Sequence, residues 1–400
     1  MKATISIVKC ENYTPSNVFR AVKEAVDLLG GMEKFIKPGQ KVLLNPNLLS
    51  ARPPESAVCT HPAVVEAAVG LATAAGGVCF VGDSPSIGGD TPKSYARLLK
   101  VSGMQDVIDR TAASPVYFEG AGTEKENPDG RVFRRILLAD AVMEADVLIN
   151  LPKFKTHELT MMSCAIKNVF GCVPGRRKVQ FHLQAGDDPV MFSQILVDVA
   201  RLVRPELSIV DAVVGMDGQG PSAGRRRRFG LIIAGADPIA VDAAACKVAG
   251  VNPMDVPMIR LAAEQGVGVA DIENIQVLGV RPEEVQIPDF MLPPRGDFIS
   301  RMPTPLYRML RNHLVRSAAF IRDKCTGCRA CVQICPTQSI SGAENLLKVD
   351  YSKCIRCYCC QEVCPEEAIY LKVSRLNGTI HGLMAVRRRV RRILKREVSG

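Results

Sequence analysis

The sequence predicts an α/β domain with a doubly wound, mostly parallel sheet, followed by a small cysteine-rich α+β domain. Throughout the segment 1–280, short and almost wholly apolar runs alternate with helical patterns. Buried parallel strands covered by helices on both faces have this pattern. Nine of the 15 cysteines lie between positions 325 and 364. A chain of 400 residues is long enough for two or three such domains.

The expected strands are short β-branched runs at the N-terminus and at 41–45, 78–82, 146–150, 207–211 and 229–235. The expected helices cover roughly 16–29, 61–75, 92–101, 190–203 and 238–249. Two helix starts are marked in the sequence. Thr60 and Asp237 each precede a proline-containing first turn, which predicts that both are N-cap residues.

Changes in composition predict four segments. We expect the α/β domain, with a ligand crevice at its strand ends, over 1–284. The proline-rich stretch that follows predicts a linker, which a basic helix over 306–320 completes, so that linker and helix span 285–320. The cysteine-rich domain is expected over 321–374, and a basic amphipathic tail over 375–400.

Charge and hydropathy limit the class of protein. The N-terminus lacks a charged head followed by an apolar run, and the most apolar window, 64–82, is broken by two glycines, so we expect a cytoplasmic protein. The segment 301–400 carries 19 Lys and Arg against 7 Asp and Glu. The basic tail would suit an acidic redox partner protein or peripheral contact with an anionic membrane. Nucleic acid is not expected, because no recognition motif accompanies the basic runs.

The cysteine-rich segment contains one motif twice. C-x2-C-x2-C-x3-C-P begins at Cys325 and occurs again from Cys354. In the bacterial two-cluster arrangement the fourth cysteine of each motif ligates the other cluster. One cluster would then use Cys325, Cys328, Cys331 and Cys364, and the other would use Cys354, Cys357, Cys360 and Cys335. Cys359 aligns with Ala330 of the first motif and is left over.

Residues 321–372 resemble the bacterial two-cluster ferredoxins, a resemblance that implies two [4Fe-4S] clusters working as an electron relay. A pair of zinc sites is the alternative, but zinc is usually held by C-x2-C pairs with a longer gap between them. A second alternative is that the clusters are structural or sense oxygen.

Polar residues follow several of the predicted strands, and they would converge at the carboxyl edge of the sheet. A loop after strand 146–150, followed by a helix that begins near 160–163, would present lysines suited to an anionic ligand. In this hypothesis Lys155 and Lys167 orient the anion and His157 transfers protons. Further binding residues are expected to be Asp83, Ser84, Lys153, Asn168 and Asp211. The alternative is a solvated loop. Cys164 would lie at the start of that helix, where the helix N-terminus and nearby lysines would favour a lowered pKa and a redox or ligand role. The alternative is a small buried thiol without such a role.

Short motifs in the α/β segment carry a second resemblance. In order they are NPNL, THP, GDSP, LPKFKTH, KNVFG, DGQGP and DPIAVDA. Over about residues 40–250 they resemble the domain-of-unknown-function family 362, which implies an iron–sulfur protein of anaerobic metabolism. This chain has Asn45 where the family often has lysine. The run from Lys155 to Lys167 is also similar to the lactate-racemase family.

Three functions are compatible with these features. The first is an oxidoreductase that relays electrons through the clusters to an anionic small molecule in the α/β domain. The second is a non-enzymatic electron carrier or adaptor that docks a redox partner. The third is a non-redox, ligand-binding enzyme with structural clusters.

Overall fold

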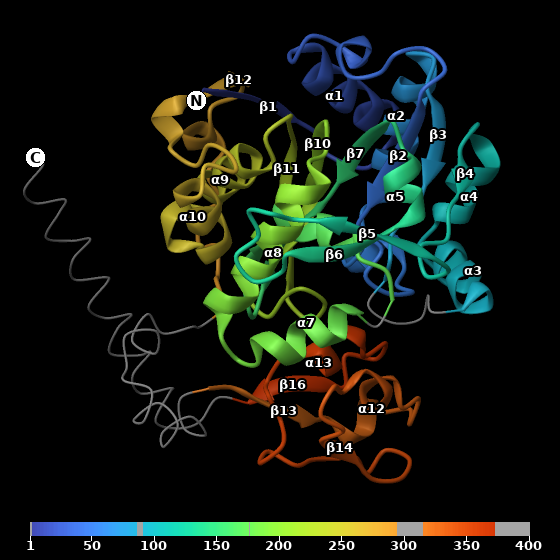
Figure 1. The fold of residues 1–400 in the computed structure, drawn as a ribbon, viewed down its shortest axis with the longest axis vertical. Coiled ribbons are helices and arrows are strands. Elements are labelled where there is room, and N and C mark those ends of the chain that lie inside the picture. Colours follow the sequence, from blue (N-terminus) through green and yellow to red (C-terminus); the bar gives the residue numbers. More distant parts are fainter. Residues whose placement is uncertain (1, 86–90, 176, 294–314, 373–400) are drawn as a thin grey trace, which may run out of the picture. The chain divides into compact units, whose positions relative to one another are not determined.

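The computed structural model describes residues 2–85, 91–175, 177–293 and 315–372 (Figure 1). The chain divides into two units, Met1–Leu292 and Pro293–Gly400.

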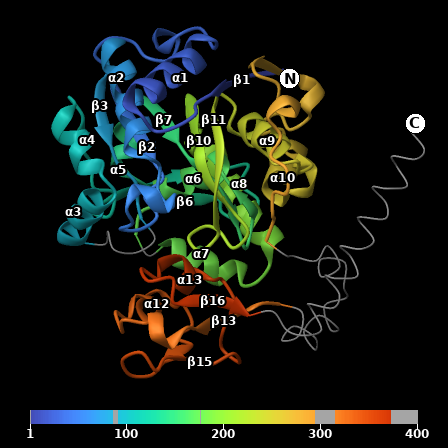
Figure 2. The ribbon, with the colours of Figure 1, turned by 180° about the vertical axis from the view of Figure 1, so that it is seen from behind.

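A mixed sheet forms the centre of the first unit, in the strand order β12-β1-β11-β10-β7-β2-β3-β4 (Figures 1 and 2). The strands are β1 (Ala3–Lys9), β2 (Lys41–Pro46), β3 (Val78–Val81), β4 (Ser114–Pro115), β7 (Val147–Leu151), β10 (Leu207–Asp217), β11 (Arg225–Gly235) and β12 (Ile275–Gly279). β10, β7, β2, β3 and β4 pair in parallel, as do β1 and β12, whereas β11 is antiparallel to both of its neighbours. The predicted α/β class with a mostly parallel sheet is confirmed.

Helices cover both faces of this sheet. On one face, Val18 and Val22 of α1 join a core cluster that includes Val42 and Ile149 of the sheet. On the other face, Ile5 of β1 meets Val241 of α9 across Gly235, where a side chain would collide with both. The helices are α1 (Pro15–Asp27), α2 (Pro62–Ala74), α3 (Pro92–Val101), α4 (Met104–Arg110), α5 (Asp140–Glu144), α6 (Ala165–Asn168), α7 (Arg177–Ala185), α8 (Pro189–Val203), α9 (Pro238–Val248) and α10 (Pro257–Glu264).

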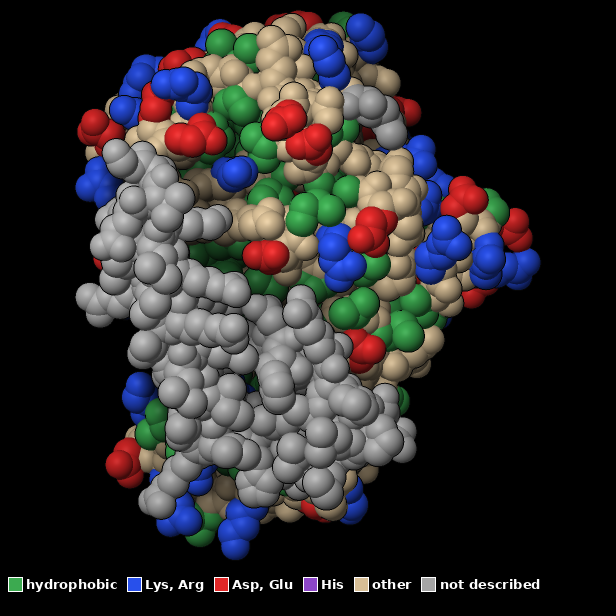
Figure 3. Space-filling view, turned by 90° about the vertical axis from the view of Figure 1, so that its left-hand side faces the viewer, with side chains coloured by type: hydrophobic (Ala, Val, Ile, Leu, Met, Phe, Trp, Pro, Cys, Tyr) green, Lys and Arg blue, Asp and Glu red, His purple; other side chains and the backbone are tan. Residues whose placement is uncertain are grey.

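Smaller elements complete the first unit. A separate two-stranded sheet joins β5 (Gly122–Glu126) to β6 (Arg135–Ala139). Single turns of 3-10 helix lie at Met32–Lys34, Pro54–Ser56, Val169–Cys172, Pro253–Asp255, Ile272–Asn274 and Pro282–Val285. On the face shown in Figure 3, acidic and basic side chains of this unit are interspersed.

One of the two predicted helix caps is confirmed. Asp237 accepts hydrogen bonds from the backbone N–H groups of Ile239 and Ala240, at 2.8 and 3.2 Å. The N-cap of α2 is His61, whose Nδ1 accepts from the N–H of Ala63, so the prediction for Thr60 is wrong. The Thr60 hydroxyl instead donates to the carbonyl of Leu151 at 2.6 Å, which ties this loop to β7.

The predicted lysine loop is also wrong, because residues Lys153–His157 form a strand, β8. After Pro152 interrupts β7, the long strand β10 still offers unpaired backbone, and β8 pairs with it in parallel. β8 then pairs antiparallel with β9 (Met161–Ser163), and helix α6 begins only at Ala165. All five residues of β8 are buried, although two lysines and a histidine among them predicted an exposed segment.

The second unit is a small α+β fold, as predicted. β13 (Ser317–Phe320) pairs antiparallel with β16 (Ile369–Lys372), and β14 (Ile340–Ser341) with β15 (Lys348–Val349). Its helices are α12 (Ala330–Ile334) and α13 (Cys359–Val363), with a 3-10 turn at Arg322–Lys324.

The helix expected over 306–320 is wrong for 317–320, because these residues form β13 and pair with β16. Residues 306–314 and the tail at 375–400 lie outside the described residues. Within the described part of the chain, no helix is long and apolar enough to cross a membrane.

The first residues of the predicted linker pack on the first unit. The N–H of Met291 donates to Oδ2 of Asp217 at 3.3 Å, and its carbonyl accepts from the N–H of Gly218 at 2.7 Å. The Phe290 ring stacks on Phe154 of β8, with ring centroids 6.1 Å apart. The packed unit therefore continues past the expected boundary at residue 284.

Candidate metal centre and candidate ligand site

Eight cysteines of the second unit surround two separate hollows. The Cys335 hollow is lined by Cys335, Cys354, Cys357 and Cys360. The Cys364 hollow is lined by Cys325, Cys328, Cys331 and Cys364. Each hollow thus takes three cysteines from one motif and the fourth from the other, which is the grouping that crossed ligation requires. Among the described residues, no three His, Cys, Asp or Glu side chains converge closely enough to hold a single metal ion.

The backbone explains why three successive thiols face one hollow. In the first motif Gly327 and Arg329 have φ values of 70° and 59°. In the second, Arg356 and Tyr358 occupy the equivalent positions, with φ values of 55° and 62°. Two left-handed residues between the cysteines coil the loop tightly. The repeat in the sequence is therefore a repeat in backbone conformation.

The fourth cysteine of each motif receives a backbone hydrogen bond. Sγ of Cys335 accepts from the N–H of Ser339 at 3.3 Å, and Sγ of Cys364 accepts from the N–H of Ala368 at 3.2 Å. Such bonds stabilise negatively charged sulfur, which is the form that ligates iron.

The ninth cysteine, Cys359, lines neither hollow. It is the first residue of α13 and is buried, with its thiol directed to the carbonyl of Cys357. Its side chain contacts that of Cys357, which lines the Cys335 hollow, but Cys359 itself is not one of the eight thiols around the hollows.

A row of polar side chains extends along one face of β8 in the first unit. Lys153, Lys155 and His157 alternate with Phe154 and Thr156, and alternate residues of a strand share a face. Phe154 packs against Phe229 in the opposite direction, with ring centroids 4.9 Å apart. We call the three alternating residues the β8 row.

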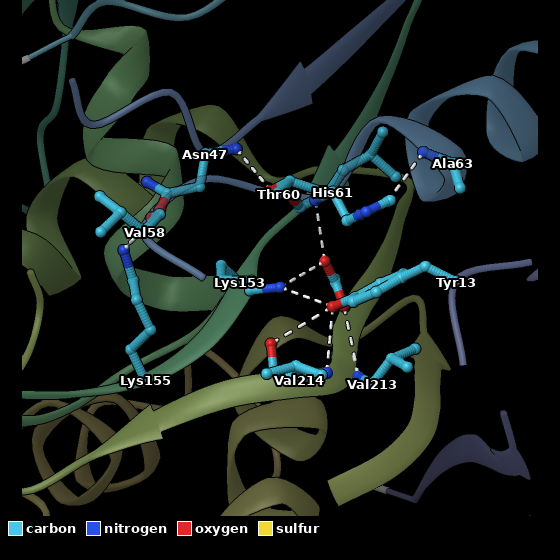
Figure 4. Close-up of polar contacts among 12 residues, drawn as sticks. Tyr13, Asn47, Val58, Thr60, His61, Ala63, Lys153, Lys155, Val213 and Val214 are labelled. Atoms are coloured by element: carbon cyan, nitrogen blue, oxygen red, sulfur yellow. Dashed lines mark hydrogen bonds and ion pairs between the residues drawn. The ribbon is translucent and has the colours of Figure 1, made fainter. Parts of the chain in front are cut away.

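Lys153 forms a fully buried ion pair with Asp211 (Figure 4). Its Nζ lies 2.8 Å from Oδ2 of Asp211 and 2.8 Å from the hydroxyl of Tyr13. Asp211 also accepts from the Tyr13 hydroxyl at 2.7 Å and from the N–H of His61 at 2.9 Å. Burial lowers the pKa of Lys153, and the Asp211 carboxylate acts against that shift. Lys153 and Asp211, which were both expected to bind the ligand, thus bind each other inside the protein.

Tyr13 and His61 lie beside this pair as two stacked rings. Their centroids are 3.6 Å apart and their planes differ by 6°. Burial lowers the pKa of His61 to about 4, against the opposing effect of Asp211, so its ring is neutral at pH 7. Since Nδ1 accepts the cap hydrogen bond, the proton is on Nε2. Sequence reasoning missed both residues. The THP motif was a signal for His61, whereas Tyr13 had none.

The neutral His61 makes stability depend on pH in a testable way. Between pH 6.5 and about 4 the unfolded histidine takes up a proton that the folded one does not, so acid favours unfolding. The variant His61→Asn keeps an N-cap side chain but does not titrate. We expect the unfolding free energy of the wild type to fall relative to the variant, by on the order of 2–3 kcal/mol, as the pH drops through this window. Denaturant titrations at a series of pH values measure this difference, and a pH-independent difference would contradict the assignment.

The other two residues of the β8 row differ in their surroundings. Nζ of the buried Lys155 donates to Oδ1 of Asn47 and to the carbonyl of Val58, both at 2.7 Å (Figure 4). Nδ1 of His157 accepts from the N–H of Leu159 at 3.1 Å, and its ring stacks toward Phe192.

The half-buried Lys167 belongs to the same end of the row as His157. Its Nζ lies 4.8 Å from the centroid of Phe170 and 5.9 Å from that of Phe192. Phe192 also stacks on His182, with centroids 4.2 Å apart. The structure therefore brings His157 and Lys167 together at Phe192, and places Lys155 separately, beside Asn47.

Asp83 and Asn168 tie the ends of three strands together. Asp83 accepts from the N–H of Leu48 at 2.8 Å and from Nδ2 of Asn45 at 3.2 Å. Asn168 donates to Oδ1 of Asn150 at 2.8 Å and to the carbonyl of Asn45 at 3.0 Å. Asn45 therefore occupies the family's lysine position as a buried connector between β2 and its neighbours.

Ser84 is held by a lysine that sequence reasoning missed. Lys178 of α7 donates to the hydroxyl of Ser84 at 2.6 Å and also to its carbonyl, and the hydroxyl donates to Glu119. Burial lowers the pKa of Lys178 to about 8 and raises that of Asp83 to about 6, each opposed by the charge of the other. A side chain on Gly171 would collide with Oδ1 of Asp83, so only glycine fits there.

The prediction that Cys164 has a lowered pKa is wrong. Burial, with the nearby Asp242 carboxyl, raises its pKa well above the ordinary value. Asp242 accepts hydrogen bonds from the N–H groups of Ala165 and Ile166, at 2.6 and 3.1 Å. The helix start that was expected to stabilise a thiolate is therefore occupied by a carboxyl group.

The fold and the two sets of cysteines define an iron–sulfur protein with an α/β unit, and comparison with known proteins agrees. Residues 318–365 match the 4Fe-4S dicluster domain, and residues 42–247 match the domain of unknown function DUF362. The chain belongs to the DUF362 family. Its iron–sulfur domain indicates a function in electron transfer or redox chemistry.

One curated relative is the thylakoid-associated protein sll1697 of Synechocystis sp. It is 33% identical over 293 residues, which cover 73% of this chain and 88% of that protein.

Two solved structures show a weaker similarity. The lactate racemase apoprotein of Thermoanaerobacterium thermosaccharolyticum matches with a TM-score of 0.38 and 11% identity over 63% of this chain. A protein of Thermotoga maritima matches with a TM-score of 0.36 and 12% identity over 64% of this chain. The matches span 58% and 60% of those two chains.

Proposed function

We propose that this protein is an oxidoreductase that relays electrons through two [4Fe-4S] clusters to an anionic small molecule bound in its α/β unit. The observation that carries the proposal is the grouping of eight cysteines around two hollows, three from one motif and one from the other in each. Four thiolates per hollow match the ligand number of a four-iron cluster, and such a cluster supplies one-electron transfer.

The anion would be held at the His157 end of the β8 row. The ammonium groups of Lys153 and Lys155 contact oxygens in the buried interior. Lys167 is half-buried and lies over the rings of Phe170 and Phe192. The positive charge of Lys167, close to the ring of Phe192 that the His157 ring also faces, would attract an anion. Lys167 would orient the anion and His157 would transfer a proton to it, while Lys153 and Lys155 support the strand from which His157 projects.

The proposal is tested first by anaerobic purification with iron, sulfide and zinc determination. Roughly eight irons per chain are expected. A preparation that contained zinc and almost no iron would overturn the cluster assignment.

The ligand site is tested on the same material. Mass spectrometry of the denatured protein should release an anionic small molecule that Lys167→Ala and His157→Ala variants lose or bind more weakly. Lys9→Ala, at an exposed position of β1, is the matched control. Retention of the same molecule in all three variants, with cluster reduction unchanged, would overturn the site assignment.

A second function is favoured by one specific observation. Lys153, Asp211, Lys155, Asp83 and Asn168 all hydrogen-bond within the protein, as in a scaffold. A non-enzymatic electron carrier or adaptor that docks a redox partner needs no further ligand. The name of the Synechocystis relative associates that protein with thylakoids, which suits docking at a membrane surface as well as in the cytoplasm. Electron transfer to an added acceptor protein, with no small molecule bound, would favour this function.

A further inference from the structure

The two cysteine hollows are related by the internal repeat of the sequence, but the groups around their sulfur atoms differ. The repeat aligns Cys335 with Cys364 and Ser339 with Ala368. It also aligns Thr337 with Glu366. Two hydroxyl-bearing residues that follow the first motif are therefore replaced, after the second motif, by residues without a hydroxyl.

Both hydroxyls lie near the same sulfur atom. The Ser339 hydroxyl oxygen is 3.2 Å from Sγ of Cys335, and the Thr337 hydroxyl oxygen is 3.7 Å from it. The N–H of Ser339 also donates to this sulfur at 3.3 Å. At Cys364 the equivalent backbone bond is present, from Ala368 at 3.2 Å, but alanine cannot add a second bond from its side chain. Ser339 is buried, so the bond between its hydroxyl and the sulfur atom is shielded from water.

A cysteine sulfur that ligates iron has no proton, so it can only accept a hydrogen bond. The Ser339 hydroxyl must therefore donate. A donor stabilises the reduced cluster, which is more negative, more than the oxidised cluster. Hydrogen bonds of this kind to ligand sulfur atoms raise the reduction potential.

The charged side chains near the two hollows differ in their burial, and this effect is separate from that of the Ser339 hydroxyl. Arg356 lines the Cys335 hollow, and the buried Glu362 lies near Cys357. Arg329 and Glu366 line the Cys364 hollow. Arg356 and Glu362 are buried, whereas Arg329 and Glu366 are exposed, so these charges also act differently on the two clusters. Cys328 of the Cys364 hollow is exposed, and water there also stabilises negative charge, so each cluster is best compared with itself across variants.

We infer that the Ser339 hydroxyl, assisted by Thr337, selectively raises the reduction potential of the cluster held in the Cys335 hollow. The inference rests on the proposed function, since it requires both clusters. Ser339 is a tuning residue that binds no iron itself. Its counterpart Ala368 has no hydroxyl, so the other cluster lacks this hydrogen bond. Ser339 therefore helps to determine which of the two clusters is reduced first.

The test is an anaerobic redox titration followed by electron paramagnetic resonance, which reports cluster reduction without any substrate. In Ser339→Ala the midpoint potential of the cluster in the Cys335 hollow should fall by up to about 59 mV. For one electron this corresponds to a change of about tenfold in the equilibrium constant for reduction. The other potential should not move. Ser339→Thr keeps a hydroxyl and should restore most of the shift. The reciprocal variant Ala368→Ser should raise the potential of the other cluster.

Iron content separates this inference from the proposed function. If the wild type holds no iron, the proposed function fails. If all variants hold roughly eight irons and Ser339→Ala leaves both potentials unchanged, the inference is overturned while the proposed function stands. If Ser339→Ala fails to load iron, Ser339→Thr and Ala368→Ser decide, and no shift in Ala368→Ser would overturn the inference.

Discussion

Replacing Cys360 by alanine should remove one of the two proposed clusters, or convert it to a form with fewer irons, whereas replacing its neighbour Cys359 should leave both intact. Cys360 lines the Cys335 hollow, and Cys359 lines neither. Removing one of four thiolates leaves an iron without its protein ligand. Iron and sulfide per chain, with the electron paramagnetic resonance spectrum, measure the outcome.

The two motifs supply a matched control. Cys331 aligns with Cys360 and lines the other hollow, so Cys331→Ala should affect the other cluster and leave the spectrum of the first. If Cys359→Ala lost iron and Cys360→Ala did not, the alignment of the two motifs would be wrong by one position.

Replacing Lys153 by alanine should destabilise the α/β unit by about 3–5 kcal/mol. Both side chains of the Lys153–Asp211 pair are fully buried, so the substitution leaves an uncompensated carboxylate against Tyr13 and His61. Since the chain has no tryptophan, the measurement is denaturant unfolding followed by circular dichroism. Cluster absorbance, which reports on the second unit, is followed separately.

Two further variants define the cause. Lys9→Ala, at an exposed position, should change stability by less than about 0.5 kcal/mol. Replacing Lys153 and Asp211 together by apolar residues should recover much of the loss, because a buried ion pair contributes little more than a well-packed apolar pair. A cost below about 1 kcal/mol for Lys153→Ala would show that the pair is hydrated, as surface ion pairs are.

Asp211 and its three partners, Tyr13, His61 and Lys153, come from four separate parts of the chain. Tyr13 and Asp211 are 198 positions apart, yet the hydroxyl of one lies 2.7 Å from the carboxylate of the other. No local pattern links them, because Tyr13 comes from the loop before α1 and Asp211 from the middle of β10. Sequence reasoning could place Asp211 and Lys153 near a strand end, but it could not show that each neutralises the other.

The lysine-rich segment shows how a correct location can carry a wrong conformation. Lys153, Lys155 and His157 follow a buried strand, as predicted, and they do lie at the carboxyl side of the sheet. They form a strand because β10 is eleven residues long and continues past the end of β7. The length of that neighbour, and the oxygens of Asn47 and Val58 that receive Lys155, are properties of distant segments.

By itself, the sequence determined the α/β class, the Asp237 cap, the two cysteine motifs and the surplus of Cys359. These features depend on residues that are close together in the sequence, such as those that set strand and helix periodicity, cap a helix or form a short repeat. They can therefore be recognised without knowing which distant segments meet. Only the tertiary structure decided which charged side chains are neutralised inside the protein. It also showed that Tyr13 and His61 hydrogen-bond to Asp211, and that the Ser339 hydroxyl lies beside the sulfur of only one hollow. The physical reason is that burial and hydrogen-bond partners arise where distant segments meet, and these set the charge and the accessibility of each polar group.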